Sequence, residues 1–244
     1  MNLRQLIGLS RDRHPGVGQE KDKIFGDVVG YDDIKRVFRM ALKSDEPIHV
    51  LLVGPPASAK TMFLEALMNK LGDKQAYFAI GSSSTKAGVL NTLFMKEPKY
   101  LMVDEIDKMP VGEQASLLGL METGELVETK VSKTRSIKLK TWVFATANTT
   151  TTLSKPLLTR FMVFSLRPYT YEDFEEVTIH LLGRRYNMKP DLAIEIASAV
   201  WHKMGSPNIR QCIKIAKMTK KKEDVEWLID TIKKYQDRGE DWNE

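Results

Sequence analysis

One short segment of the chain has the residue types and spacing that suit the binding of a polyphosphate. It reads Gly54-Pro55-Pro56-Ala57-Ser58-Ala59-Lys60-Thr61, between an apolar run at 49–53 and an amphipathic run at 62–71. A strand, a turn and a helix in this order direct backbone amides and the helix N-terminus at anionic oxygens. We expect Lys60 to reach the β- and γ-phosphates of a nucleotide and the Thr61 hydroxyl to ligate Mg²⁺. We call residues 54–61 the phosphate loop and expect it, with Met62, to bind the nucleotide.

The phosphate loop departs from the usual pattern at one position, where Ala59 stands in place of glycine. A side chain is tolerated there if the backbone φ is negative, since only positive φ favours glycine. We therefore expect Ala59 to have a helical, negative φ. An ordinary proline-containing turn before Lys60 is the alternative to a phosphate loop.

A second apolar run, 100–103, ends in Asp104 and Glu105. This run has the composition of a strand buried on both faces of a parallel sheet, and ligands bind beyond the carboxyl ends of such strands. We expect Asp104 to hold Mg²⁺ through water and Glu105 to polarise the attacking water. The alternative is a strand that ends in two surface acids.

Three further polar residues stand where they could contact a phosphate. Asn148 follows the apolar run 142–145, and its amide could bind both a γ-phosphate oxygen and water. Arg160 lies between apolar residues, where its planar guanidinium suits a transition-state phosphate, as an arginine supplied by a neighbouring subunit does. Arg210 lies near the start of a predicted helix, where the helix dipole does not favour a cation. The alternatives are an asparagine in a polar loop and a surface arginine paired with a carboxylate.

The elements that must position these residues alternate between strands and helices. The hydrophobic pattern predicts strands at 49–53, 76–80, 100–103, 142–145 and 162–166, with helices between several of them. This alternation is typical of a parallel sheet covered on both faces. After Pro168 only helices are predicted, at 171–184, 190–203, 207–218 and 223–235. We expect an arm at 1–22, an α/β nucleotide-binding domain at 23–168 and a small helical domain at 169–244.

The composition is that of a soluble globular protein of 244 residues, with 42% hydrophobic and 28% charged residues. No apolar run is long enough to span a bilayer, the N-terminus does not resemble a signal peptide, and we expect no membrane partner. The single cysteine, Cys212, fits a small core residue in a reducing cytoplasm. The histidines lack metal-ligand spacing, so we expect no metal beyond Mg²⁺. A net charge of +5 permits a nucleic-acid partner.

Together these motifs closely resemble the AAA+ ATPases over residues 23–220. GPPASAKT is similar to the Walker A loop, LMVDEID to Walker B, and Asn148 to sensor 1. Arg160 matches the arginine finger and Arg210 matches sensor 2, while Val29 and Gly30 would lie against adenine. The resemblance implies a P-loop NTPase fold with an αβα sandwich, a five-stranded parallel sheet and an all-α lid. It also implies ATP and Mg²⁺ as ligands and a ring, typically a hexamer.

Two branches of the superfamily compete. TRSIKLKTWVFATAN followed by LSKPLLTRF resembles the RuvB branch-migration motors of Holliday junctions, whereas DEIDKM, LMETGEL and the Ala-Lys pair resemble the MCM helicases. RuvB-type proteins carry a winged-helix DNA-binding domain that we do not expect in this chain. They also have the lid arginine directly after Gly-Thr-Pro, where Asn208 stands here. A separate DNA-binding or adaptor protein is therefore a further expected partner.

The segment at about 124–141 predicts a basic β-hairpin. Ile137 and Leu139 alternate with lysines, and we expect Ser132 to Arg135 to form the tip, with Lys133 and Arg135 projecting. The contact residues would be Lys130, Lys133 and Arg135, placed in a ring pore to bind a phosphate backbone. The alternative is a solvated hairpin whose lysines protect an edge. We interpret the lysines at 217 and 220–222 as charges favoured locally at a helix end.

The leading hypothesis is an ATP-driven ring motor that acts on DNA by branch migration or helicase-type translocation. The first alternative is a protein-remodelling ATPase of the MoxR type, in which the hairpin grips polypeptide. The second is a nucleotide switch or loader subunit with little turnover, which the set of polar residues described above disfavours.

Overall fold

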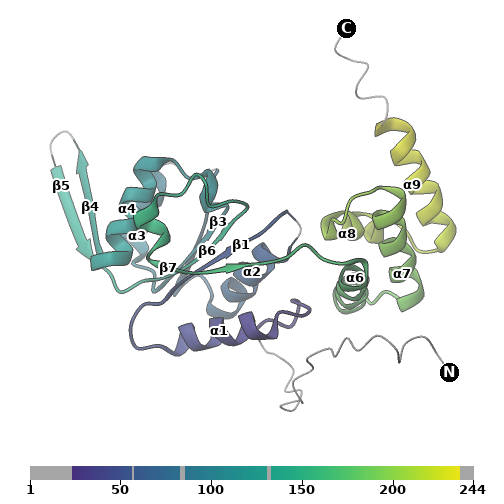
Figure 1. Ribbon diagram of the computed structural model, residues 1–244, viewed down its shortest axis with the longest axis horizontal. Coiled ribbons are helices and arrows are strands. Elements are labelled where there is room, and N and C mark those ends of the chain that lie inside the picture. Colours follow the sequence, from purple (N-terminus) through teal and green to yellow (C-terminus); the bar gives the residue numbers. More distant parts are fainter. Residues whose placement is uncertain (1–23, 57, 83–85, 131–132, 237–244) are drawn as a thin grey trace, which may run out of the picture.

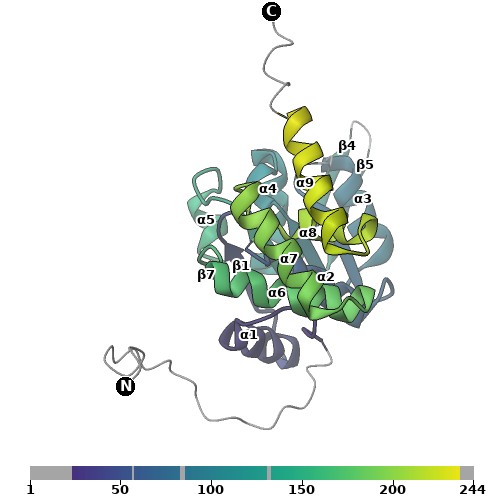
Figure 2. The ribbon, with the colours of Figure 1, turned by 90° about the vertical axis from the view of Figure 1, so that its right-hand side faces the viewer.

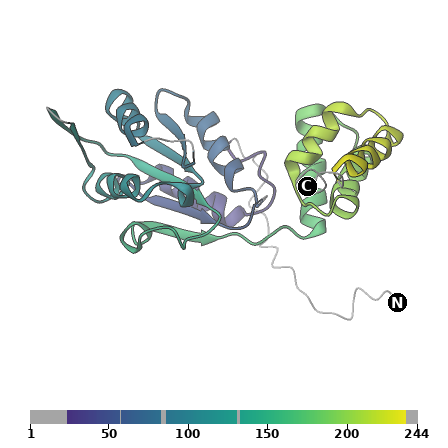
Figure 3. The same ribbon diagram turned by 90° about the horizontal axis from the view of Figure 1, so that it is seen from above.

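The chain forms two lobes that are joined by the segment between β7 and α6 (Figures 1 and 3). The computed structural model describes residues 24–56, 58–82, 86–130 and 133–236. The first lobe contains a parallel sheet with the strand order β2-β3-β6-β1-β7. Its strands are β1 (His49–Val53), β2 (Ala76–Ile80), β3 (Tyr100–Asp104), β6 (Trp142–Ala147) and β7 (Phe161–Ser165). The expected five-stranded parallel sheet is confirmed.

Helices cover both faces of this sheet, as the alternating hydrophobic pattern predicts. They are α1 (Asp32–Lys43), α2 (Lys60–Leu71), α3 (Lys86–Lys96), the 3₁₀ turn η2 (Ile106–Lys108), α4 (Val111–Thr123) and α5 (Lys155–Leu158). Consecutive strand residues point to opposite faces. Leu51 packs with α3, α4 and α5, whereas Val50 and Leu52 pack with α1 and α2. The sheet is therefore buried on both faces. We call the side of the sheet at which its parallel strands end the carboxyl edge, and the opposite side, at which they begin, the amino edge.

The second lobe, which we call the lid, is made of helices over its described residues. It contains α6 (Tyr171–Tyr186), α7 (Pro190–Ser198), the π turn η3 (Ala199–Lys203), α8 (Ile209–Met218) and α9 (Lys222–Gln236). The single helix predicted at 190–203 is thus a helix followed by a π turn. Cys212 is fully buried in the lid core, as expected, and burial raises the pKa of its thiol to about 12.

The lid contacts the first lobe through ion pairs and through its core. Arg185 of α6 donates two hydrogen bonds to the Asp27 carboxylate, at 3.0 and 2.6 Å. The lid core also extends to Ala59 of the phosphate loop and to Met62 of α2. The helices of the lid therefore lie beyond the carboxyl edge of the sheet, as Figure 2 shows with the lid in front.

A hairpin of β4 (Glu125–Lys130) and β5 (Lys133–Lys138) protrudes from the first lobe on the side away from the lid (Figure 1). Its strands pair antiparallel with Lys130 opposite Lys133, and residues 131–132 lie outside the described part of the chain. Leu126 and Leu139 anchor the base of the hairpin in the sheet core, whereas Val127 is 49% exposed. None of the described helices is both long and apolar enough to cross a bilayer.

Candidate functional site

The phosphate loop connects the end of β1 to the start of α2 at the carboxyl edge of the sheet. The Lys60 Nζ donates hydrogen bonds to the carbonyl oxygens of Gly54 at 2.8 Å and Pro55 at 2.7 Å. The Ser58 hydroxyl also donates to the Pro55 carbonyl, at 2.8 Å. The loop thus curls around the Lys60 ammonium group, while Ala57 lies outside the described residues.

Gly54 is needed at the first position of the loop because the neighbouring backbone approaches closely. A Cβ atom there would lie 2.7 Å from the Leu166 carbonyl oxygen. The Gly54 N–H donates to the Ala147 carbonyl at 3.1 Å, which ties the loop to the end of β6. The loop is therefore held by the strands on both sides of β1.

Ala59 has a φ of +61°, so the expectation of a negative φ was wrong. The residue is the N-cap of α2, and the turn from the loop into the helix uses the left-handed conformation there. For a residue with a Cβ this conformation costs about 1–2 kcal/mol. The Ala59 side chain is buried against the lid core, so its methyl group contributes packing where glycine would contribute none.

Asp104, at the end of β3, lies beside the start of α2. The Thr61 hydroxyl donates to its carboxylate, with 3.1 Å between Oγ1 and Oδ2. Thr146 of β6 donates a hydrogen bond to the same carboxylate and accepts one from the Glu105 N–H, at 3.0 Å. Asp104 is 8% exposed, and a buried carboxylate needs such donors. One threonine hydroxyl therefore positions both acidic residues.

Glu105 follows Asp104 in a left-handed conformation, with a φ of +53°. Its carboxylate accepts a hydrogen bond from Lys108 Nζ at 2.9 Å, and this bond is the main cause that raises the pKa of Lys108. The backbone turn at Glu105 and the bond that its N–H donates to Thr146 direct the residue away from the sheet core. Glu105 is therefore half-exposed at the carboxyl edge.

Burial lowers the pKa of Lys60, because desolvation disfavours the ammonium form. The carboxylates of Asp104, Asp107 and Glu105 oppose this effect in that order. An anionic ligand that carries a bound metal cation would complement both parts of this site: its negative charge would face the lysine, and its cation would face the carboxylates. The carboxyl edge therefore combines one buried lysine with a group of acids.

Asn148 lies at the same edge, directly after β6. Because β6 lies between β1 and β3, Asn148 stands between the phosphate loop and the acidic pair. Sequence reasoning did not assign Thr146, although it precedes Asn148 by two residues and residues two apart share a face of a strand. That spacing could have identified it.

Arg160 lies at the opposite, amino edge of the sheet. It precedes Phe161, which pairs with His49 at the start of β1, whereas the phosphate loop follows the end of β1. Five strand residues at about 3.3 Å each put about 16 Å between these edges. Its guanidinium donates to the Glu122 carboxylate, which is the surface pairing considered as the alternative. Within one chain, Arg160 is not part of the carboxyl-edge group.

Arg210 lies in the first turn of α8 and is exposed. The helix begins after Asn208, whose side chain accepts the Arg210 N–H at 2.9 Å. Arg210 is therefore presented on the lid surface, with its backbone held by the N-cap.

Val29 and Gly30 lie where the lid meets the phosphate loop. Val29 packs against the lid core, and Gly30 is exposed, with a φ of +70°. Next to them, Tyr31 packs against Tyr169, with their ring centroids 6.1 Å apart. Tyr169 is 92% buried by residue area, and burial raises the pKa of its hydroxyl. Sequence reasoning missed both tyrosines, because they are far apart in the sequence and meet only through the segment that connects β7 to the lid.

Arg135 lies differently from the expectation, whereas Ser132 of the expected tip lies outside the described residues. Arg135 does not project: its guanidinium carbon lies 4.2 Å from the Phe94 ring centroid, and it donates to Asn91 at 3.1 Å. The reason is cation–π attraction to α3, which holds the side chain against the lobe. Lys130 and Lys133 pair at the outer end of the hairpin.

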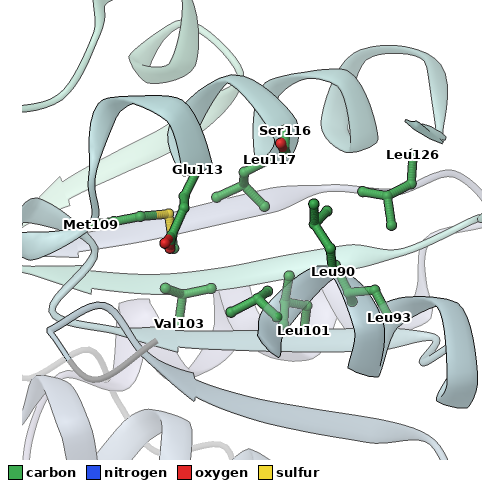
Figure 4. A pocket seen from close by; sticks show the side chains of 10 residues that line it. Leu90, Leu93, Leu101, Val103, Met109, Glu113, Ser116, Leu117 and Leu126 are labelled. Atoms are coloured by element: carbon green, nitrogen blue, oxygen red, sulfur yellow. The ribbon is translucent and has the colours of Figure 1, made fainter. Parts of the chain in front are cut away.

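An apolar gap between α3 and α4 lies apart from these residues (Figure 4). Leu90, Leu101, Met109 and Leu117 are among the residues around it, and the Glu113 side chain points into it. Its volume of about 20 Å³ is close to that of one water molecule. The gap is therefore a packing defect and not a nucleotide site.

Comparison with known proteins agrees with this arrangement. Residues 50–169 match the model of the ATPase family associated with various cellular activities (AAA), a range that contains the phosphate loop, the acidic pair and Asn148. Residues 50–169 are therefore an AAA domain. The helical lid follows this matched region.

Among curated proteins, this chain is 33% identical to the Holliday junction branch migration complex subunit RuvB of Acholeplasma laidlawii over 162 residues. That match covers 61% of this chain and 48% of the relative, so the chain spans about half the length of the RuvB relatives. It is also 24% identical to the zygotic DNA replication licensing factor mcm6-A of Xenopus laevis, over 88% of this chain and 30% of that protein.

Among solved structures, the Thermotoga maritima RuvB Holliday junction branch migration motor superposes with a TM-score of 0.60 at 18% identity. The superposition covers 83% of this chain and 70% of that chain. A mutant form of RuvB reaches a TM-score of 0.65 at 17% identity, over 87% and 73%. This likeness shows that the fold is shared.

Proposed function

We propose that this chain is an ATP-hydrolysing motor that assembles into a ring and acts on DNA. The observation that carries the proposal is the convergence of Lys60, Thr61 and the Asp104–Glu105 pair at one edge of the sheet. These residues are the parts that phosphoryl transfer needs: a cation for the phosphates, oxygen ligands for a metal and a carboxylate for water. The likeness to RuvB and to the MCM relative supports the choice of DNA.

In this proposal Lys60 leaves the Gly54 and Pro55 carbonyl oxygens and binds the β- and γ-phosphates. The Thr61 hydroxyl and the Asp104 carboxylate, 3.1 Å apart, form an oxygen donor set that fits Mg²⁺. Bound Mg²⁺ would neutralise charge on the phosphates. Val29, Gly30 and Met62, at the junction with the lid, would contact the adenosine part.

Glu105 is the proposed general base. Its carboxylate, which accepts a hydrogen bond from Lys108 Nζ, would take a proton from the attacking water. Asn148 would orient that water and the γ-phosphate, since an amide both donates and accepts. Arg210 would reach the phosphates when the lid moves toward the carboxyl edge.

Arg160 is the proposed link between subunits. It lies at the amino edge of its own chain, so it can meet a nucleotide only at the carboxyl edge of another copy. An arginine that acts on a neighbouring site requires a closed or continuing assembly of copies. A ring, proposed as a hexamer, would complete each site and present the hairpins with Lys130 and Lys133 to DNA.

ATP turnover measured with and without branched or single-stranded DNA tests this function. We expect DNA to raise turnover, and Glu105→Gln to leave ATP bound while turnover falls at least about 100-fold, because the base is lost. Charge reversal by Lys130→Glu/Lys133→Glu should abolish the rise with DNA and leave basal turnover unchanged. The matched control is Lys70→Glu/Lys74→Glu at the far end of α2.

Full turnover in the Glu105→Gln protein would refute the assignment of the base. Turnover that is indifferent to DNA but rises with a partner protein would favour protein remodelling of the MoxR type. A single burst of hydrolysis without steady turnover would favour a nucleotide switch or loader.

A further inference from the structure

The lid carries an open groove of about 680 Å³ that is separate from the proposed ATP site. It lies where the connection between α6 and α7 faces the end of α8 and the start of α9. We call it the lid groove. Among the described residues that line it, the charged ones are five lysines and one aspartate: Lys189, Lys217, Lys220, Lys221, Lys222 and Asp191.

The fold brings these lysines together from two separate stretches of the chain, 186–192 and 216–222. Lys189 precedes α7, Lys217 lies in the last turn of α8, and the other three lie directly before α9 or at its start. Taken by themselves, the lysines at 217 and 220–222 can be explained as positive charges that are favoured locally at a helix end. Lys189 cannot, because it joins them only through tertiary packing, and it directly precedes the N-terminal end of α7, where a cation is unfavourable.

Nearby carboxylates offset little of this charge. Asp224 accepts the backbone N–H groups of Lys220 and Lys221, both at 3.0 Å, and leaves their ammonium groups exposed. Lys222 reaches Glu195 only at 3.9 Å, the outer limit of an ion pair. The groove therefore has a positive potential that favours an anionic occupant.

The walls of the groove are apolar as well as basic. Met218 is 70% exposed and Tyr186 is 37% exposed, and Met188 and Leu192 are half-buried beside them. Exposed methionines adapt to varied apolar partners, and lysine stems add apolar area below their charged ends. The groove thus offers apolar contacts inside a basic rim.

We propose that the lid groove binds an acidic amphipathic segment of a partner protein. An amphipathic helix lays its apolar face into such a groove and leaves its carboxylates at the rim. A nucleic acid fits less well, because methionine and leucine offer nothing to phosphates. A path for a single strand uses several stacked aromatic rings, whereas Tyr186 is the one aromatic residue among the described residues of the groove. The volume suits a few side chains. The inference does not depend on ATP hydrolysis or on DNA binding.

The test uses the full chain and a fluorescein-labelled synthetic helix of about sixteen residues, with glutamates on one face and leucines on the other. Anisotropy should show saturable binding that weakens between about 50 mM and about 300 mM salt. Lys220→Glu/Lys221→Glu should weaken binding about tenfold or more. The charge-matched control, Lys233→Glu/Lys234→Glu at the other end of α9, should change it less than about twofold.

Two further arms separate charge from shape. Met218→Ser keeps every lysine and should still weaken binding several-fold, and a peptide with serine in place of leucine should bind about tenfold less tightly. Equal binding of the two peptides, equal effects of the two lysine pairs, or absence of saturable binding would overturn the proposal. So would a single-stranded DNA oligonucleotide that binds more tightly than the peptide and depends on Lys220 and Lys221. Thermal melts check that each variant is folded.

Discussion

The polar group at the carboxyl edge of the central sheet and Arg160 at the amino edge are held in different ways. At the carboxyl edge, Lys60, Asp104 and Thr146 are buried and bonded to residues of the same chain. At the amino edge, Arg160 has 39% of its side chain exposed and bonds to Glu122 on the surface. The bonds of the first group are all made within one chain. Arg160 can exchange Glu122 for a partner on another molecule at low cost, since exposed ion pairs contribute little to stability.

Removing one residue from each edge gives the largest expected effects. Lys60→Ala and Arg160→Ala should each lower ATP turnover at least about 100-fold, because each removes charge from the phosphates. If the edges of different copies meet, mixing the two variants should restore part of the turnover, since some sites then contain both residues. Steady-state ATPase assays over a range of mixing ratios measure this.

The double variant Lys60→Ala/Arg160→Ala is the control. Mixed with either single variant it cannot form an intact site, so turnover should stay low. Restoration in those mixtures, or none in the mixture of single variants, would contradict the assignment of Arg160 to a neighbouring site.

Thr146→Val should give the next largest effect. Valine has the shape of threonine but cannot donate to Asp104 or accept from Glu105, so we expect kcat to fall roughly 10- to 100-fold. Nucleotide affinity should change less than about threefold, because the Lys60 contacts remain. Thr146→Ser keeps the hydroxyl and should retain most activity. Equal losses in both variants would indicate a packing role only.

Ala59→Gly should stabilise the protein by about 1 kcal/mol, because glycine relieves the left-handed strain but adds chain entropy on unfolding. The matched control is Ala66→Gly in the middle of the same helix, which should destabilise by about 1 kcal/mol or more. Urea unfolding at equilibrium measures both changes. A loss of stability at both positions would mean that the buried Ala59 methyl group outweighs its strain.

The smallest expected effect is the pH dependence of stability that His49 causes at the amino edge. His49 is buried there, with its Nδ1 accepting the Val143 N–H at 3.1 Å and its Nε2 facing the Met121 carbonyl at 3.3 Å. Burial lowers the pKa of His49, so the unfolded chain binds its proton first. Stability should be full above the unfolded pKa of about 6.5 and fall as pH drops toward the lower folded value.

Urea unfolding between about pH 8 and about pH 5.5 measures this fall, above the range where most carboxyl groups titrate. In the His49→Gln protein the free energy of unfolding should depend less on pH over that range. An unchanged pH dependence would assign the effect to other groups.

The sequence by itself determined the alternation of strands and helices, since burial on both faces of a sheet requires continuous apolar runs such as 49–53 and 100–103. It also placed Lys60, Asp104 and Asn148 at strand ends, because parallel strands end at a common edge. Tertiary structure alone decided the positive φ of Ala59, the bonds of Thr146 to the acidic pair, and the packing of Arg135 on Phe94. These depend on how segments far apart in the chain meet, and the two-residue spacing between Thr146 and Asn148 is the one local pattern that points to any of them. The same holds for the lid groove, where Lys189 joins lysines that follow it by almost thirty residues.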